Sequence, residues 1–313
     1  MNVSIRLLEE QELASADQIF RLAFGTFIGL PNPTEFAGDS DYIIHRWQTN
    51  PQSAFAAEID GKLIGSNLVT NWGSFASFGP LSVHPEFWNQ GIAQSLIEPA
   101  ISCFSQWNTQ LSGIHTFAQS HKHHKLYQKF GFRLRFLTTI LGKSVQHASS
   151  LPENSRYSQL SDNERTESLK ASIQLTDSIY PGFDVSQQIE TVEKQNLGDT
   201  VFLWNDAGLA GFAVCHIGAG TEAGSNNCFV KLGAVRSGND AQKSFDQLLD
   251  LCEGLTVALG MSRLIAGVNT SREAAYLQML SRGFQSQIIG VAMHRPNEIG
   301  YNRGDVFVLD DWR

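Results

Sequence analysis

The most informative segment of the sequence is residues 83–96, VHPEFWNQGIAQSL, which changes from a strand pattern to a helix pattern within a few positions. The turn between the two contains Gly91 and Ala93, the two smallest residue types. The first N–H groups of a helix have no intrahelical partner, and with the helix dipole they form a site for anions. A larger side chain would hold a phosphate away from this backbone. We therefore expect the turn to bind a pyrophosphate.

Two neighbouring patterns support this prediction. The preceding segment, PLSVHP, indicates a strand whose pairing is weakened by Pro80. Downstream, KLYQKFGF at residues 125–132 predicts a short helix that ends at Gly131 in a left-handed cap. The chain thus offers a strand with free backbone groups, a small turn at a helix start, and a second helix that carries Tyr127.

The chain contains this layout twice. Asp60 and Gly65 align with Asp206 and Gly211, and LYQKFGF at residues 126–132 aligns with QMLSRGF at residues 278–284. Each half indicates helices, a hairpin, a further strand, a long helix, a strand, a short helix and a closing strand. We expect Pro99 to kink or interrupt the long helix of the first half.

A polar segment rich in Ser, Pro and Asn, residues 144–164, predicts a linker between the halves. We therefore expect an N-terminal domain over residues 1–148 and a C-terminal domain over residues 149–313, which suits a chain of 313 residues.

The composition narrows the function classes. A net charge of −8 argues against a nucleic-acid partner. The four cysteines have no short spacing, so we expect buried, reduced thiols. The N-terminal residues lack a signal-peptide pattern, and no apolar run approaches the ~20 residues of a membrane span. We expect a soluble, cytoplasmic protein without a membrane partner.

The strand, the small turn, the helix and the KLYQKFGF segment resemble the GNAT family, the acetyl-CoA-dependent N-acetyltransferases, in two tandem copies over nearly the whole chain. The resemblance implies an α/β (α+β) fold in which each copy has a mixed, mostly antiparallel central sheet flanked by helices. It also implies acetyl-CoA as co-substrate, no metal, and transfer of the acetyl or another acyl group to a primary amine by direct attack in the N-terminal domain.

The resemblance also implies particular site residues. The family turn has the pattern Gln/Arg-x-x-Gly-x-Gly/Ala, and Trp88 departs from its first position. Ser120 stands where the family usually has an asparagine. Tyr127 would be the general acid for the departing thiolate, because a phenol with a pKa near ~10 suits a thiol leaving group. The implied cofactor-binding residues are Leu81, Ser82, Val83, Trp88, Asn89, Gln90, Gly91, Ile92, Ala93, Gln94, Ser95 and Ser120.

The general base is left open, because the strand before the turn lacks the carboxylate that the family often has there. A water relay is one alternative, and the others are His84, Glu86, Glu58, Glu35, Asp39 and Asp41. The histidines of IHTFAQSHKHHKLY have no acidic or cysteine companions. We interpret them as a solvated helix start and not as a metal site.

The second copy has lost the characteristic residues. Lys243, Phe245 and Met279 stand where the first copy has Gly91, Ala93 and Tyr127. We expect a degenerate cofactor turn and a structural or cleft-shaping role. We expect the acids of the terminal segment, Asp310 and Asp311, to face solvent.

Residues 24–47 form a long loop region with aromatic residues and three acids. It is interpreted either as a lid over the acceptor or as a small satellite core. Its candidate wall residues are Phe24, Phe27, Phe36, Tyr42 and Trp47.

Several alternatives remain open from the sequence. The protein could be a non-catalytic coenzyme A sensor or scaffold, its activity could reside in the C-terminal copy, or it could be an interaction module without a cofactor. The acceptor, a small-molecule or peptide amine, is unidentified, as are the preferred acyl chain and the choice between monomer and homodimer.

Overall fold

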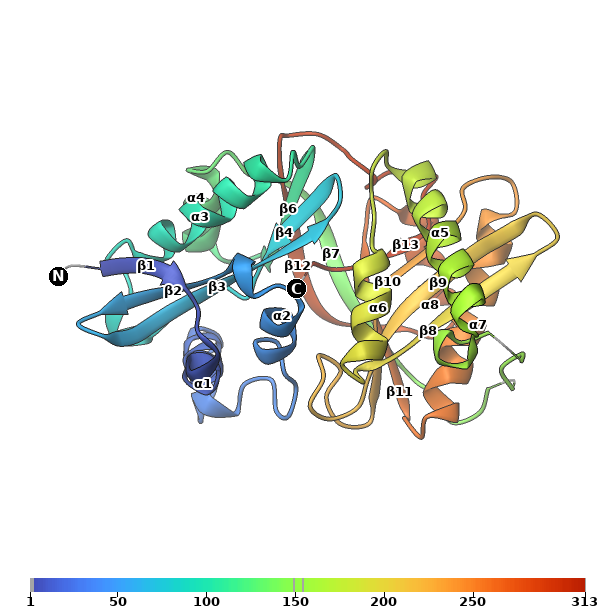
Figure 1. The fold of residues 1–313 in the computed structure, drawn as a ribbon, viewed down its shortest axis with the longest axis horizontal. Coiled ribbons are helices and arrows are strands. Elements are labelled where there is room, and N and C mark those ends of the chain that lie inside the picture. The colour runs from blue at the N-terminus through green and yellow to red at the C-terminus, as the bar shows by residue number, and fades with distance from the viewer. Residues whose placement is uncertain (1–2, 149, 154, 313) are drawn as a thin grey trace.

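A computed structural model describes residues 3–148, 150–153 and 155–312. Two halves lie side by side, with the strands β7 (Arg133–Ser144) and β12 (Gln285–Arg295) between them (Figure 1). All but two of the described strands follow one path through a mixed sheet, in the order β1-β2-β3-β4-β6-β12-β7-β11-β10-β9-β8. This is the expected α/β architecture of two copies. The expected domain boundary falls at residue 149, which lies outside the described residues.

The first half follows the element order that the sequence predicts, except that a strand at residues 3–7 precedes the helices and the further strand is divided into two, at residues 75–78 and 82–83. Asp60 and Gly61 form the expected tight hairpin turn, both with positive φ (50° and 77°). Gly131 has the φ of 87° that a left-handed cap requires. The elements are β1 (Val3–Leu7), α1 (Leu13–Ile28), α2 (Ile44–Thr49), β2 (Ala54–Ile59), β3 (Lys62–Trp72), β4 (Phe75–Phe78), β5 (Ser82–Val83), α3 (Ile92–Gln106), β6 (Leu111–Phe117), α4 (His121–Gln128) and β7.

The expected interruption of the long helix does not occur. Pro99 lies inside α3, which continues from Ile92 to Gln106 without a break. Proline removes one backbone donor in a helix interior. The apolar face of α3, which buries Leu96, Ile97, Ala100 and Phe104 against the sheet, is sufficient to keep the helix in one piece.

The second half repeats the order of the first without counterparts of β1 and β5, and it ends with an additional short strand. Gly283 ends its short helix with a φ of 86°, as Gly131 does in the first half. The elements are α5 (Asp162–Ile179), α6 (Ser186–Lys194), β8 (Gly198–Asn205), β9 (Gly208–Ile217), β10 (Asn227–Val235), α7 (Ala241–Ala258), β11 (Arg263–Asn269), α8 (Glu273–Ser281), β12 and β13 (Val308–Leu309).

The two halves exchange their closing strands. β12 of the second half lies between β6 and β7, while β7 of the first half lies between β12 and β11. All three pairings are antiparallel, and β7 follows β11 from Arg263↔Ser144 to Asn269↔Thr138. Each half therefore completes the sheet of the other, and the second half supplies a strand next to β6.

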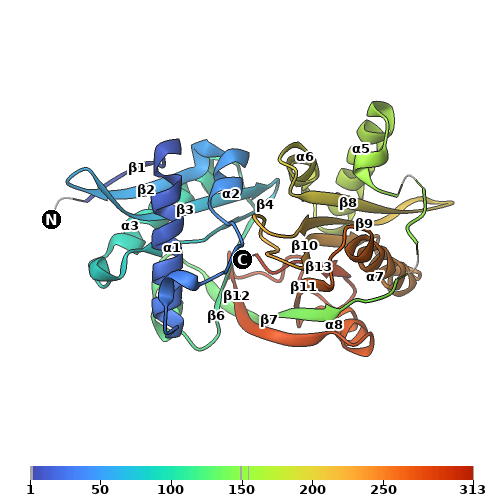
Figure 2. The same ribbon diagram turned by 90° about the horizontal axis from the view of Figure 1, so that it is seen from below.

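Helices cover both faces of the sheet. In the first half, α1 and α2 lie on one face and α3 and α4 on the other (Figures 1 and 2). In the second half, α5 and α6 pack on one face through Phe202 and Phe212, and α7 and α8 on the other through Val201 and Ala213. This alternation of neighbouring residues is typical of a strand buried on both faces.

The C-terminal segment is buried, which corrects the expectation for its two acids. Asp310 and Asp311 are 1% and 3% exposed. Asp310 pairs with Arg272, which is itself 0% exposed, so the charge is compensated inside the protein. The sequence suggested solvent exposure for these acids because Arg272, which pairs with Asp310, is distant along the chain.

The four cysteines are buried and free, as expected. Among the described helices, none combines the length and the apolar character that a membrane span requires.

Candidate functional site

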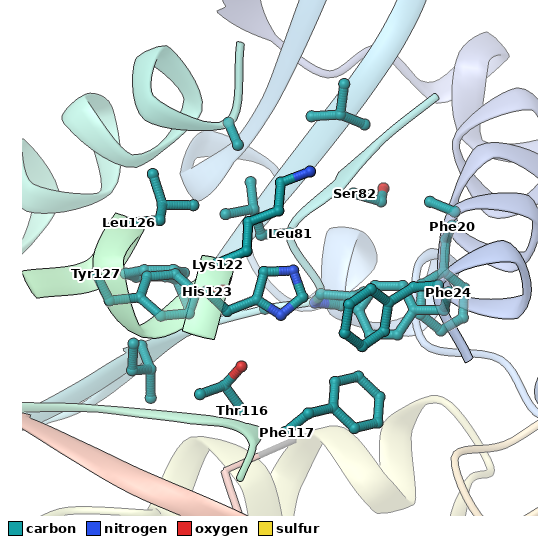
Figure 3. A pocket seen from close by; sticks show the side chains of 18 of the residues that line it. Phe20, Phe24, Leu81, Ser82, Thr116, Phe117, Lys122, His123, Leu126 and Tyr127 are labelled. Carbon is teal, nitrogen blue, oxygen red and sulfur yellow. The ribbon is translucent and has the colours of Figure 1, made fainter. Parts of the chain in front are cut away.

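A cavity of about 710 Å³ lies in the first half. Its walls come from α1 and the loop that follows it, from β4, β5 and the turn before α3, and from β6 and α4. The second half closes it with Ile288 and Gly290 of β12 and with Trp312. Figure 3 shows the side chains of Tyr127 and His123 from α4 facing those of Phe20 and Phe24 from α1 across this space.

The turn that the sequence singled out borders the cavity. Gly91 is the N-cap of α3 with a left-handed φ of 85°, a conformation that favours glycine. The first bonds to its carbonyl oxygen come from the N–H groups of Gln94 (2.9 Å) and Ser95 (3.2 Å). The N–H groups of Gly91, Ile92 and Ala93 thus precede the helical ladder and have no partner within it.

The cavity brings most of the sequence-predicted cofactor residues together. Gln90 donates from its amide to the Glu86 carbonyl oxygen (3.3 Å), and Ser120 caps α4 by accepting from the His123 N–H (3.4 Å). These two and Ser95 do not line the cavity. The predicted residues that line it are Leu81, Ser82, Val83, Trp88, Asn89, Gly91, Ile92, Ala93 and Gln94.

The strand before the turn diverges from its neighbour, as the position of Pro80 suggested. β4 pairs in parallel with β6 up to Ser77↔Gly113, whereas β5 pairs with β3. The His84 N–H bonds the Ile64 carbonyl (2.8 Å), so the adjacent pair Val83↔Gly65 is a non-hydrogen-bonded one. The N–H and C=O groups of Val83 consequently point away from β3.

Trp88, the departure from the family pattern, has a definite role in this geometry. Its indole N–H donates to the Val83 carbonyl oxygen (2.6 Å). The ammonium of Lys122 lies over the Trp88 ring, 5.1 Å from its centroid. Trp88 therefore fixes the turn to β5 and holds a positive charge near the helix start.

Tyr127 lies on α4 with its ring against Phe78 (centroids 5.9 Å apart). The residue is 9% exposed, and burial raises the pKa of its phenol well above the ordinary value. Its hydroxyl has no hydrogen-bond partner among the described residues, although the side chain lines the cavity. The phenol is thus protonated at neutral pH and available to donate.

Sequence reasoning missed two sets of residues on α4. His123 was expected in a solvated helix start, but its side chain lines the cavity 6.4 Å from the Tyr127 ring, centroid to centroid. Lys122, Lys125 and Lys129 line the cavity as well. The spacings were visible in the sequence, because residues three or four positions apart share one face of a helix.

The residues that sequence reasoning considered as bases do not line the cavity. Glu58 pairs with Arg6 (2.7 Å), and the side chain of Glu86 is 75% exposed. The His84 Nδ1 accepts from the Glu86 N–H (3.4 Å). The acids of the loop after α1, Glu35, Asp39 and Asp41, are also absent from the lining.

His123 provides a spectroscopic test of this environment. Burial, together with the nearby charges of Lys122 and His124, lowers the pKa of His123 to about 4. We expect its imidazole signals in an NMR titration to move with a midpoint near 4, and His123→Gln to identify those signals by their loss. A midpoint at the ordinary value near ~6.5 would show that the ring is solvated.

The lowered pKa of His123 also determines the direction in which its contribution to stability changes with pH. The pKa of His123 is lower in the folded than in the unfolded chain, so the unfolded chain binds more protons between the two values. The contribution of His123 therefore destabilises the fold as the pH falls through this window.

The comparisons with known proteins agree with this geometry. Residues 17–132 match the sequence profile described as the acetyltransferase (GNAT) family. This part of the chain is thus similar to the GNAT acetyltransferases. The matched residues include the turn at Gly91 and Tyr127. No curated protein matches the chain significantly in sequence.

Solved structures extend the similarity to the whole chain. A putative acetyltransferase from Pyrococcus horikoshii superposes with a TM-score of 0.67 at 13% identity, covering 99% of this chain and 95% of its own. A GCN5-related N-acetyltransferase from Sphaerobacter thermophilus gives 0.57 at 13% identity, with 94% and 95% covered. A tandem GNAT protein from the clavulanic acid biosynthesis pathway gives 0.56 at 11% identity, with 94% and 98% covered. The chain therefore has the tandem GNAT fold.

The second GNAT copy differs from the first where the cavity would lie. β10 pairs in parallel with β11 over residues 227–230 and then pairs with β13 at Gly233 and Ala234. In the first copy the equivalent backbone diverges, because β4 pairs with β6 whereas β5 pairs with β3. In the second copy β13 pairs with β10 at this position. Phe245, aligned with Ala93, is 0% exposed against Phe307.

The position equivalent to Ser120 in the second copy is Arg272. Its guanidinium donates to the Val308 carbonyl, to Asn302 and to Asp310, all of the C-terminal segment. The groove of the second copy is therefore filled by the chain itself.

No group of three or more His, Cys, Asp or Glu side chains that could hold a metal ion occurs in the part of the chain that the structure describes.

Proposed function

We propose that this protein is an N-acetyltransferase that moves the acetyl group of acetyl-CoA to a primary amine, with its active site in an N-terminal domain of residues 1–148. The observation that carries the proposal is the shared cavity. One space is lined by the helix start at Gly91, by the freed edge of β5 and by the phenol of Tyr127. These are an anion site, a hydrogen-bonding strand and a proton donor.

The charge around the helix start supports a phosphate-bearing co-substrate. Lys122, Lys125 and Lys129 line the cavity, and the Lys129 ammonium reaches the Gln94 amide oxygen (3.3 Å) in the first turn of α3. These three lysines line the same cavity as the first N–H groups of α3, although the chain as a whole has a net charge of −8. They favour an anion with several charges, such as the phosphates of coenzyme A.

The proposed reaction needs one bond to form and one to break. The amine nitrogen bonds to the thioester carbonyl carbon, and the carbon–sulfur bond breaks. The thiolate takes the phenolic proton of Tyr127, and the amine gives up a proton to a base. The Val83 N–H, directed away from β3, would hydrogen-bond the pantetheine arm and hold the thioester near Tyr127.

A charge change at Ala93 tests the cofactor site. Ala93 lines the cavity in the first turn of α3, where it is half-buried. We expect Ala93→Glu to weaken acetyl-CoA binding by about 10- to 100-fold, because the carboxylate faces the phosphates. Isothermal titration calorimetry measures the loss.

Ala93→Gln is the matched control, since it has the same length without the charge. We expect Ala93→Gln to bind acetyl-CoA several-fold more tightly than Ala93→Glu does. Equal affinity of the Glu variant and the wild type would place the phosphates elsewhere and refute the site.

A further inference from the structure

One part of the cavity is lined by aromatic rings. Phe24, Phe27 and Phe36 come from α1 and the loop after it, and Phe117 from the end of β6. The Phe27 and Phe117 rings lie 5.1 Å apart, and those of Phe24 and Phe36 5.3 Å apart. We call these four residues the aromatic wall. Of the expected wall residues, Phe24, Phe27, Phe36 and Tyr42 line the cavity, whereas the Trp47 indole donates to the Leu8 carbonyl (2.8 Å). Phe24, Phe36, Tyr42 and Trp47 also pack against a hydrophobic core, so this region has features of both interpretations.

No aspartate or glutamate occurs among the described residues that line the cavity. The acids of the loop after α1 are bonded elsewhere. Asp39 accepts from the Ser225 N–H (2.9 Å), and Asp41 accepts from the N–H groups of Ile43 and Ile44 (both 2.9 Å). Glu35 accepts from the Asn32 amide (2.8 Å). A polycationic acceptor would thus find no counter-charge here.

His123 lies between the aromatic wall and Tyr127 (Figure 3). Its ring is 4.7 Å from that of Phe27, centroid to centroid. Its Nδ1 atom is buried and has no hydrogen-bond partner in the described part of the chain. A buried polar atom without a partner costs stability, and a bound substrate can satisfy it.

We propose that the acceptor is an aromatic primary amine with a single amino group, and that His123 takes its proton. The inference rests on the proposed acetyl transfer and names its substrate class. The ring of the acceptor packs on the aromatic wall, and its amine lies beside His123. The amine binds in its neutral form, which is also the nucleophilic form.

The physical reason is desolvation. An apolar wall without a carboxylate disfavours an ammonium ion and lowers the pKa of a bound amine. Aromatic rings also gain from offset or edge-to-face packing against one another. Once the nitrogen is bonded to the carbonyl carbon it becomes strongly acidic, so even a weakly basic imidazole accepts its proton.

Binding to the protein saturated with coenzyme A tests the substrate class. The probes are 2-phenylethylamine, its N,N,N-trimethyl derivative and spermidine, titrated calorimetrically at pH 7.0 and 8.5. We expect 2-phenylethylamine to bind at least tenfold more tightly than either other probe. Its affinity should rise by about 30-fold between the two pH values, because the neutral fraction of an amine with a pKa near ~10 rises by that factor.

The pH comparison is interpretable because the groups in this part of the cavity are few. They are Tyr42, His115, His123 and Tyr127, which line the cavity, together with Lys122 and His124, whose charges act on His123. The quaternary derivative carries a fixed charge and reports any change in the protein itself. A pH dependence shared by both aromatic probes would overturn the neutral-amine inference.

Other outcomes separate this inference from the proposed function. Acetyl-CoA binding without any 2-phenylethylamine binding would overturn the substrate class alone. Tighter binding of spermidine or of the quaternary probe would do the same, the latter by indicating cation–π recognition. Failure of acetyl-CoA itself to bind would overturn the proposed function, and the inference with it.

Two variants test the named residues. Phe24→Ala should weaken 2-phenylethylamine binding about tenfold, whereas Phe136→Ala should leave it unchanged, because Phe136 is 39% exposed on β7 and does not line the cavity. His123→Gln should lower kcat by about 100-fold with little change in the affinity for the probe. An unchanged kcat would show that His123 does not accept the proton of the amine.

Discussion

Tyr127→Phe is expected to lower kcat by about 10²- to 10⁴-fold while acetyl-CoA affinity stays within about threefold of the wild type. The substitution removes one oxygen atom and keeps the ring that packs on Phe78. Burial raises the pKa of Tyr127, so the phenol keeps its proton throughout the physiological range until the thiolate departs. Only the departure of the thiolate needs that proton, so the loss should appear in kcat and not in binding.

The measurement is thiol release under saturating acetyl-CoA, with calorimetry for the binding. Tyr157→Phe is the matched control, because Tyr157 is also buried and burial also raises its pKa, yet it lies in the second half away from the cavity. Activity of Tyr127→Phe equal to that of the control would mean that water, or another group, protonates the thiolate.

Local features of this fold could be predicted from the sequence, because a few adjacent residues determine them. The hairpin at Asp60-Gly61, the caps at Gly131 and Gly283 and the turn at Gly91 all depend on backbone conformations that few residue types adopt. The internal repeat of the sequence then predicted that these features occur in two copies. The turn at Gly91 and the strand before it, which line one end of the cavity, could be predicted in the same way, because both are short local patterns.

The strand exchange could not be predicted. β7 and β12 occupy equivalent positions in the two copies, and either could pair with the sheet of its own half. The choice depends on non-local pairing and on the junction where Phe75 of one half packs on Tyr301 and Trp312 of the other. It also has a functional consequence, because β12 and Trp312 close the cavity of the first half.

The second copy thereby acquires a role although its own groove is filled. It lends β12 to the first sheet, and its residues Glu222 and Ser225 hydrogen-bond the loop after α1. Asp39 of that loop binds Ser225, and the Tyr42 hydroxyl donates to the Glu222 carbonyl (3.3 Å). A copy that supports the structure of the first one is consistent with the loss of small residues at its own turn.

A buried charge cluster around Glu222 also connects the two halves. Its carboxylate accepts from Arg46 (2.8 and 2.9 Å) and from Lys231 (2.7 Å), and its side chain is 2% exposed. Arg46 also donates to the Gly79 carbonyl (2.8 Å), which borders the cavity. Glu222 in the second half thus positions the backbone before β5 in the first.

We expect Glu222→Gln to lower the free energy of unfolding by about 3–5 kcal/mol, because it leaves Arg46 and Lys231 buried without their carboxylate. Urea denaturation at pH 7 measures the change. Glu193→Gln is the matched control, since Glu193 pairs with Arg165 (2.9 Å) at the surface with 38% of its side chain exposed. An exposed pair contributes at most about 1 kcal/mol, so the two variants should differ clearly.

The pH dependence of this difference identifies its origin. Burial alone would raise the pKa of Glu222, but the attraction of Arg46 and Lys231 outweighs it and holds the pKa well below the ordinary value. A lowered pKa in the folded chain contributes stability above the unfolded value near ~4.5, and this contribution is lost as the pH falls further. The wild type should therefore lose its advantage over Glu222→Gln below pH ~4.5. A constant difference down to pH 3 would instead attribute the loss to packing, because a neutral glutamine and a protonated glutamate carry the same charge.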